Sequence, residues 1–191
     1  ARHRLHIPTL FMGDVIHGYR TIFPIPLGLA SSWDVDAAAQ MARISARESA
    51  VSGLFLTFSP MVDLVRDPRW GRVMESTGED PRLNAEFARA MVRGYQGGDL
   101  RNDVERVAAC VKHFAAYGAP VGGRDYNTVD MSERELRDMY LPGYRAAIEA
   151  GAKTVMTSFN TVNGMPASGN KHLLRDILRK EWGFDGALIS D

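Results

Sequence analysis

Short apolar segments alternate with longer amphipathic segments along most of this 191-residue chain. The short segments are brief and largely apolar, which is typical of strands buried on both faces of a parallel sheet. We predict six such strands, at residues 10–13, 27–30, 54–58, 109–114, 154–159 and 187–190.

The longer segments between them have the periodicity and the end signals of helices. One spans about residues 34–52, with small and apolar residues on one face. A second begins at Pro81, because proline suits the first helical turn. A third begins with a capping box, in which Ser132 accepts from the backbone and Glu135 reaches back, and a fourth covers 172–181. Strands that alternate with helices predict an α/β fold with a parallel sheet.

Charge and composition exclude several classes of partner. The 23 Lys and Arg balance the 23 Asp and Glu, so the formal net charge is zero. Nucleic-acid binding needs a basic surface, and no apolar run is long enough to span a bilayer. We therefore expect no nucleic-acid partner and no membrane association. The single cysteine, Cys110, lies in an apolar stretch and is predicted to be a small buried core residue.

The sequence contains no convincing cofactor or metal signal. His3 and His6 have a spacing that suits a metal, but no third ligand follows them, so we expect exposed helix residues. Glycine-rich nucleotide motifs and a serine-hydrolase elbow are absent from the sequence. We expect neither a cofactor nor a metal.

Polar residues recur where the predicted strands end. In a barrel of parallel strands the active site lies at the carboxyl ends of the strands, so we expect these side chains to converge on one mouth. They include two carboxylates, two cations and an imidazole: Asp14, Asp191, Arg72, Lys112 and His113.

This set of groups suits a sugar. Carboxylates accept hydrogen bonds from sugar hydroxyls, cations donate to them, and a second carboxylate can attack the anomeric carbon. The same set also allows an aldolase-type lyase that uses Lys112 as a Schiff base. Spacing alone does not decide between these chemistries.

Three ordered motifs resemble those of glycoside hydrolase family 3. Residues 63–72 read Asp-Leu-Val-Arg-Asp-Pro-Arg-Trp-Gly-Arg, which resembles the highly specific DPRWGR signature of that family. Lys112-His113-Phe114 resembles its KHF segment, and residues 182–191 resemble the segment that ends in the nucleophile. The match covers nearly the whole chain, and the branch that it resembles is that of bacterial periplasmic β-glucosidases.

The resemblance implies a fold, a reaction and a location. The fold is the front portion of an incomplete (β/α)8 TIM-type barrel, with residues 1–191 forming a partial N-terminal barrel domain up to the nucleophile-bearing strand. The reaction is retaining hydrolysis of terminal β-D-glucosyl residues from β-glucosides or short β-gluco-oligosaccharides. The family's acid/base Glu lies on a second α/β domain, which is absent here, so we expect little activity from this chain alone. The resembling branch implies a periplasmic or secreted location.

The resemblance also assigns roles to individual residues. Asp191 is the implied nucleophile. The first sugar subsite comprises Asp14, Arg72, Lys112 and His113, and two further residues, Met156 and Phe159, stand beside the nucleophile. Many members have Tyr in place of Phe159, with a hydroxyl that contacts the nucleophile, and Phe159 lacks that hydroxyl.

Several alternatives stay open. The activity is that of a β-glucosidase, or of a β-xylosidase or another β-glycosidase of the same family, or the chain is a non-catalytic carbohydrate-binding fragment. Arg72 binds sugar or braces its loop by pairing with Asp63 or Asp67. Trp70 stacks on a sugar or anchors its loop in the interior.

Overall fold

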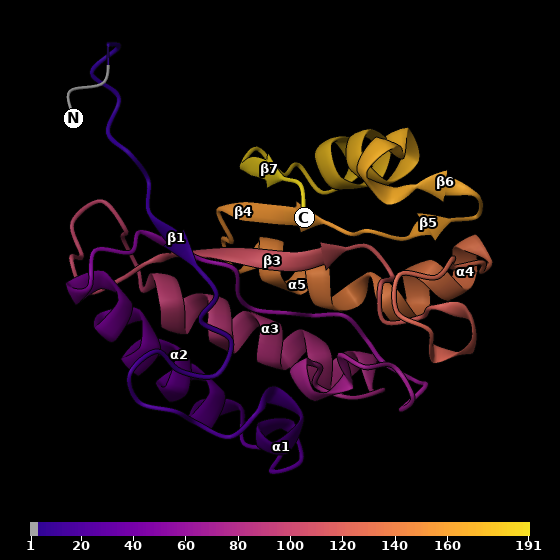
Figure 1. Ribbon diagram of the computed structural model, residues 1–191, viewed down its shortest axis with the longest axis horizontal. Helices are drawn as coiled ribbons and strands as arrows, with labels where there is room; N and C mark the ends of the chain where they lie inside the picture. The colour runs from indigo at the N-terminus through magenta and orange to yellow at the C-terminus, as the bar shows by residue number, and fades with distance from the viewer. Residues whose placement is uncertain (1–3) are drawn as a thin grey trace.

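The computed structural model describes residues 4–191, and its centre is a parallel sheet (Figure 1). Five strands lie in the order β1 (Met12–Gly13), β2 (Leu56–Thr57), β3 (Ala108–Phe114), β4 (Thr154–Thr157) and β7 (Ala187–Ile189). Each strand pairs in parallel with the next, so spatial order follows chain order. The sheet curls as part of a cylinder. The predicted incomplete α/β barrel is therefore confirmed.

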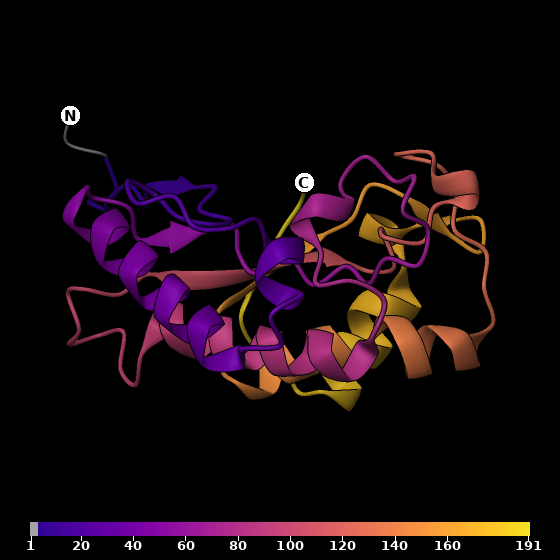
Figure 2. The ribbon, with the colours of Figure 1, turned by 90° about the horizontal axis from the view of Figure 1, so that it is seen from below.

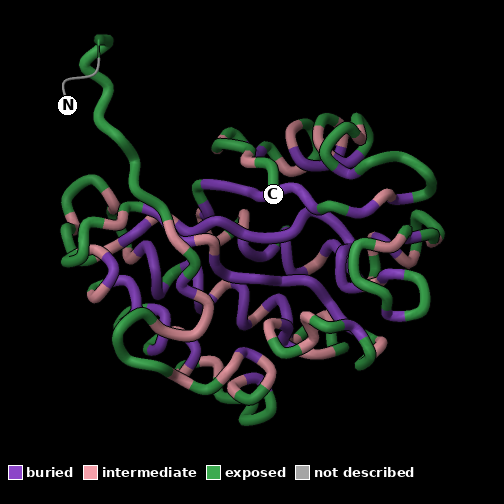
Figure 3. The backbone as a smooth tube through the Cα atoms, viewed as in Figure 1, coloured by how far each residue is buried: buried purple, intermediate pink, exposed green. Residues whose placement is uncertain are grey.

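Helices connect successive strands and shield one side of the sheet (Figures 1 and 2). They are α2 (Val35–Val51), α3 (Pro81–Gln96), α5 (Pro142–Glu149) and the π-type helix η5 (His172–Glu181). The main core lies between helices and strands, and the backbone is most deeply buried there (Figure 3). Its members include Ala42, Phe87, Val111, Tyr144 and Ile177.

The starts of α2 and α3 are capped by aspartates. Asp34 accepts from the backbone N–H of Ala37 at 2.8 Å, and Asp80 accepts from that of Leu83 at 2.7 Å. Such caps satisfy N–H groups that have no partner within the helix. Each predicted helix start is confirmed within about one residue.

Close contact between α2 and α3 depends on Gly94. A Cβ atom built at this position would lie 2.5 Å from the carbonyl oxygen of Ala39 and 2.7 Å from the Cβ of Ala42. Both distances are too short for real atoms, so only glycine lets the helices approach this closely.

The third predicted helix is interrupted. It consists of α4 (Glu133–Glu135), the π-type turn η3 (Leu136–Tyr140) and α5, and the break falls at Leu141, just before Pro142, which lacks a backbone N–H. Ser132 caps the start by accepting from the N–H of Glu135 at 3.1 Å, as predicted. The other half of the capping box is wrong, because the Glu135 carboxylate instead accepts from Arg66 at 3.1 Å.

The predicted strand at residues 27–30 is wrong, since Pro26–Ala30 forms the helix α1. Pro26 stands at its first position, where its fixed φ favours a helical turn. Periodicity cannot distinguish a helix from a strand in an apolar run of this length. The first strand is also shorter than predicted, because Leu10 and Phe11 are exposed and precede β1.

A small hairpin escaped prediction. Strands β5 (Thr161–Val162) and β6 (Met165–Pro166) pair in an antiparallel manner around Asn163-Gly164. Both turn residues have positive φ, 50° and 79°. Asn-Gly between two strands is a strong hairpin signal, so the sequence did contain the information.

His6 is exposed, as expected, but it does not lie in a helix. His3 lies outside the described residues, and His6 is exposed in an irregular segment with φ of 54°. Within residues 4–191 no group of three or more His, Cys, Asp or Glu side chains is arranged to hold a metal ion. In the same part of the chain, no helix has both the length and the apolar character to cross a membrane.

Cys110 is expected to resist alkylation in the folded chain. It is fully buried beside Leu56 and Met156, which confirms the prediction, and burial raises the pKa of its thiol to about 11. The reactive thiolate is therefore scarce below that pH. Near pH 8 we expect iodoacetamide to react about a hundredfold more slowly than with the urea-unfolded chain, because each pKa unit is a tenfold change in thiolate. Equal rates by mass spectrometry would contradict this.

Candidate active site

Six of the seven predicted site residues line one pocket at the carboxyl ends of the strands. Its volume is about 630 Å³, and apolar side chains including Phe58 and Ile189 complete its wall. The six residues come from every strand of the sheet or the loop that follows it: Asp14, Arg72, Lys112, His113, Met156 and Asp191. Convergence at strand ends is the arrangement that parallel barrels use for their sites.

An ion pair joins the first and third strands across this pocket. Lys112 Nζ lies 3.0 Å from Asp14 Oδ1. The Lys112 side chain is 5% exposed, whereas that of Asp14 is 64% exposed. The buried Lys112 side chain thus holds the exposed Asp14 carboxylate at the pocket opening. The Asp14 oxygens can accept further hydrogen bonds there, which suits binding of two neighbouring hydroxyl groups.

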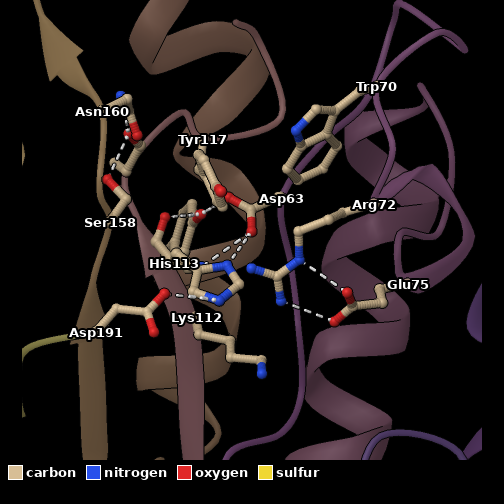
Figure 4. Close-up of polar contacts among 12 residues, drawn as sticks. Asp63, Trp70, Arg72, Glu75, Lys112, His113, Tyr117, Ser158, Asn160 and Asp191 are labelled. Atoms are coloured by element: carbon tan, nitrogen blue, oxygen red, sulfur yellow. Dashed lines mark hydrogen bonds and ion pairs between the residues drawn. The ribbon is translucent and has the colours of Figure 1, made fainter. Parts of the chain in front are cut away.

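His113 lies between two carboxylates (Figure 4). Its Nε2 is 3.3 Å from Asp191 Oδ2, and its Nδ1 is 2.7 Å from Asp63 Oδ2. The His113 ring is buried. Asp191 lies two residues beyond the end of β7. Asp191 therefore contacts the His113 ring through Nε2, while Asp63 holds the same ring through Nδ1.

Lys112 and His113 are adjacent in sequence, yet both line the pocket. In a regular strand they would point to opposite faces. The pairing of β3 with β4 shifts register between Val111 and Phe114, so the regular alternation is interrupted there. The peptide bonds before His113 and before Ala115 are cis.

Arg72 is clamped by Glu75 rather than by Asp63 or Asp67. Its Nε and Nη2 lie 2.8 and 3.0 Å from the two Glu75 oxygens (Figure 4). Burial alone disfavours the charged guanidinium, but the hydrogen bonds and charge of Glu75 outweigh it and raise the pKa of Arg72. Asp67 pairs with Arg69 instead, at 2.6 Å. The clamp leaves Arg72 charged at the pocket wall.

The loop that carries Arg72 is anchored by aromatic rings. Trp70 is fully buried, and its Nε1 donates to Asp125 at 2.9 Å, so the anchoring alternative for this residue is the one that the structure supports. Tyr117 packs edge-on against Trp70, and the Arg72 guanidinium lies 5.6 Å from the centre of the Tyr117 ring.

Met156 and Phe159 take different places. Met156 is buried beneath the pocket beside Leu56 and Cys110. Phe159 lies two residues beyond β4 and is 44% exposed, outside the pocket lining. Its ring packs against Tyr117 and Tyr126, with centroids 5.7 and 5.1 Å away.

Glu75 was missed as part of the site. Its spacing from Arg72, i and i+3 in a helical turn, is the signal that identifies such a pair. Asp14 and Glu75, the other carboxylates of the pocket lining, are each ion-paired to a cation. Asp191 therefore differs from them, because its contact is to the imidazole of His113.

The fold and the pocket define a barrel domain with a carboxylate-containing site at its carboxyl end. Residues 1–191 match the glycosyl hydrolase family 3 N terminal domain, and the chain belongs to that family. The resemblance of its motifs is thereby confirmed.

Curated relatives point to β-glycosidases. The chain is 50% identical to the periplasmic beta-glucosidase of Salmonella typhimurium and 40% identical to a beta-xylosidase of Formosa agariphila. Each alignment covers 100% of this chain, but only 25% and 28% of the relative. The chain thus spans about a quarter of the length of these relatives.

The chain is also similar to solved structures of β-glucosidases. The chain superposes on the β-glucosidase from Listeria innocua in complex with isofagomine with a TM-score of 0.98 and 63% identity. This match covers 99% of this chain and 27% of that one. The same enzyme in complex with glucose gives a TM-score of 0.97, covering 98% and 26%.

Proposed function

We propose that this chain forms the front part of a retaining, exo-acting β-glucosidase that removes terminal β-D-glucosyl residues. The observation that carries the proposal is the pocket itself, where Asp191 lies among Asp14, Arg72, Lys112 and His113. One carboxylate faces the reacting carbon, and the charged groups around it bind the hydroxyls of a single sugar ring.

The proposed reaction has two displacements. An oxygen of Asp191 bonds to the anomeric carbon while the bond from that carbon to the leaving oxygen breaks. The leaving oxygen takes a proton from a carboxylic acid on a second domain of the full-length enzyme. Water then attacks the anomeric carbon, gives a proton back to that carboxylate and releases Asp191. Two inversions retain the configuration of the sugar.

The pocket favours glycosidase chemistry over a Schiff-base lyase. A Schiff-base lysine must present a neutral amine, which a nearby carboxylate disfavours. Lys112 Nζ donates to Asp14 Oδ1 at 3.0 Å, so the nitrogen is engaged by a carboxylate and is not free to attack a carbonyl carbon.

The relatives support the substrate class and the location. The Listeria innocua enzyme has been solved with glucose and, as a D270A mutant, with laminaribiose, and the Salmonella typhimurium relative is a periplasmic β-glucosidase. We infer that the full-length enzyme acts on β-glucosides or short β-gluco-oligosaccharides in the periplasm or outside the cell.

A 2-fluoro-β-glucoside with a good leaving group tests this proposal. Fluorine at C2 slows both displacements, and the activated leaving group lets the first one proceed, so the glycosyl-enzyme accumulates. Full-length enzyme should gain one fluoroglucosyl group on the peptide that contains Asp191. A label on another carboxylate, or no label on an active enzyme, would refute the assignment.

A β-xylosidase of the same family is the second candidate, because a relative with 40% identity has that activity in its name. Xylose lacks the hydroxymethyl group of glucose, so the two sugars differ by contacts at one edge of the ring. The ratio of kcat/KM for aryl β-glucoside and aryl β-xyloside discriminates between them, and a ratio below one would favour the xylosidase.

A further inference from the structure

A buried carboxylate lies behind the pocket and does not line it. Asp63, in the loop after β2, is 1% exposed and receives three hydrogen bonds. Its Oδ2 accepts from Nδ1 of His113 at 2.7 Å and from the backbone N–H of the same residue at 3.1 Å. Its Oδ1 accepts from the hydroxyl of Tyr144, in α5, at 2.6 Å. A buried charge needs such partners, and here they all come from two residues.

The contact of Asp63 decides which atom of His113 faces the pocket. An ionised carboxylate only accepts, so Nδ1 must donate to Asp63. The opposite nitrogen, Nε2, then lies 3.3 Å from Asp191 Oδ2. A ring with one proton would present a lone pair to that carboxylate, whereas a ring with two protons donates to both carboxylates.

Tyr144 completes the arrangement from the helix layer. Its hydroxyl lies 2.6 Å from both Asp63 Oδ1 and the carbonyl oxygen of His113. Its single proton is shared between these two acceptors, so Tyr144 links Asp63 to the backbone of His113. Burial and then the charge of Asp63 raise the pKa of Tyr144 well above its usual value, so this hydroxyl stays a donor.

We propose that Asp63 is a positioning residue that fixes the His113 ring through Nδ1 and thereby holds Nε2 beside Asp191, with Tyr144 fixing Asp63. This inference rests on the proposed role of Asp191. Hydrogen bonds join α5, the loop after β2 and β3, and the 3.3 Å contact of His113 with Asp191 extends this chain to the end of β7. Asp191 is therefore held before a sugar enters, and such outer partners commonly change activity 10- to 100-fold.

Asp63→Asn is the informative variant, because it keeps the shape of the side chain and one acceptor oxygen but removes the charge. Asp103→Asn is its control. Asp103 also accepts from a side-chain N–H and a backbone N–H, those of Arg106 at 3.1 Å and Glu105 at 3.0 Å. None of these residues lines the pocket.

The experiment compares full-length wild type and both variants by kinetics on an aryl β-glucoside and by ¹⁵N spectra of histidine-labelled protein at neutral pH. We expect Asp63→Asn to lower kcat roughly 10- to 100-fold and to shift the ring ¹⁵N signals of His113, because Nδ1 loses its carboxylate partner. Asp103→Asn should keep kcat within about twofold and leave the His113 signals unchanged. The His113→Gln spectrum assigns these signals.

Two outcomes would overturn the inference: equal kcat values for the two variants, or His113 signals that do not change in Asp63→Asn. If Asp63→Asn does not fold, Tyr144→Phe removes one donor from Asp63 and should shift the same signals in the same direction. Failure of the proposed function is seen separately, as an active wild-type enzyme that a 2-fluoroglucoside does not label on Asp191.

Discussion

Replacement of Asp191 by alanine is expected to lower kcat of the full-length enzyme by about four to six orders of magnitude, the scale seen when a nucleophile is removed. The methyl group of alanine cannot bond to the anomeric carbon, while the proposed sugar-binding groups on the other strands stay in place. KM should change much less than kcat. Turnover of an aryl β-glucoside measures both.

Azide provides a check that the loss is chemical. In the cavity left by Asp191→Ala, azide can attack the anomeric carbon, so added azide should restore turnover and yield an α-glucosyl azide by a single inversion. Asp185→Ala is the matched control, because Asp185 is exposed at the opposite end of the same strand. It should keep kcat within about twofold. A β-configured azide product would contradict the nucleophile assignment.

Phe114→Ala is expected to reduce the free energy of unfolding by about 3–5 kcal/mol. Phe114 is fully buried at the end of β3, where its ring packs edge-on against Tyr144 in α5 at 5.2 Å and against Trp182 at 5.9 Å. Truncation leaves a cavity that joins strand and helix layers, and the loss is a large share of the roughly 5–15 kcal/mol that stabilises a typical domain.

Urea titration followed by circular dichroism measures this change. Phe55→Ala is the control, because Phe55 precedes β2 and is 54% exposed. Its replacement should cost no more than about 0.5 kcal/mol. Equal shifts of the urea midpoint in the two variants would show that Phe114 is not a core residue of this fold.

Sequence patterns predicted the elements that burial determines. The third strand of the sheet, Ala108–Phe114, lies within one residue of its predicted range, because apolar residues dominate it. The pocket was predicted for a related reason: a polar residue at the end of a buried parallel strand lies at the common mouth, as Asp14 and Asp191 do.

Contacts that depend on tertiary geometry were not predictable. The helix at Pro26–Ala30 was mistaken for a strand, because four apolar residues suit both. Arg72 has acidic residues on both sides in sequence, and only the folded loop selects Glu75. Phe159 was expected beside Asp191, but β4 ends at Thr157, so the chain has already turned away toward Tyr126.

Strand order that follows chain order has a consequence for biosynthesis. The pocket joins residues far apart in sequence: the ion-paired Asp14 and Lys112 are separated by 98 in residue number, and such long-range contacts form slowly. During synthesis, a chain that has emerged only as far as β4 already contains Asp63, Lys112 and His113. The proposed nucleophile arrives with β7, as the last strand to join this sheet. The proposed sugar-binding groups are therefore synthesised before the carboxylate that is proposed to act on the sugar.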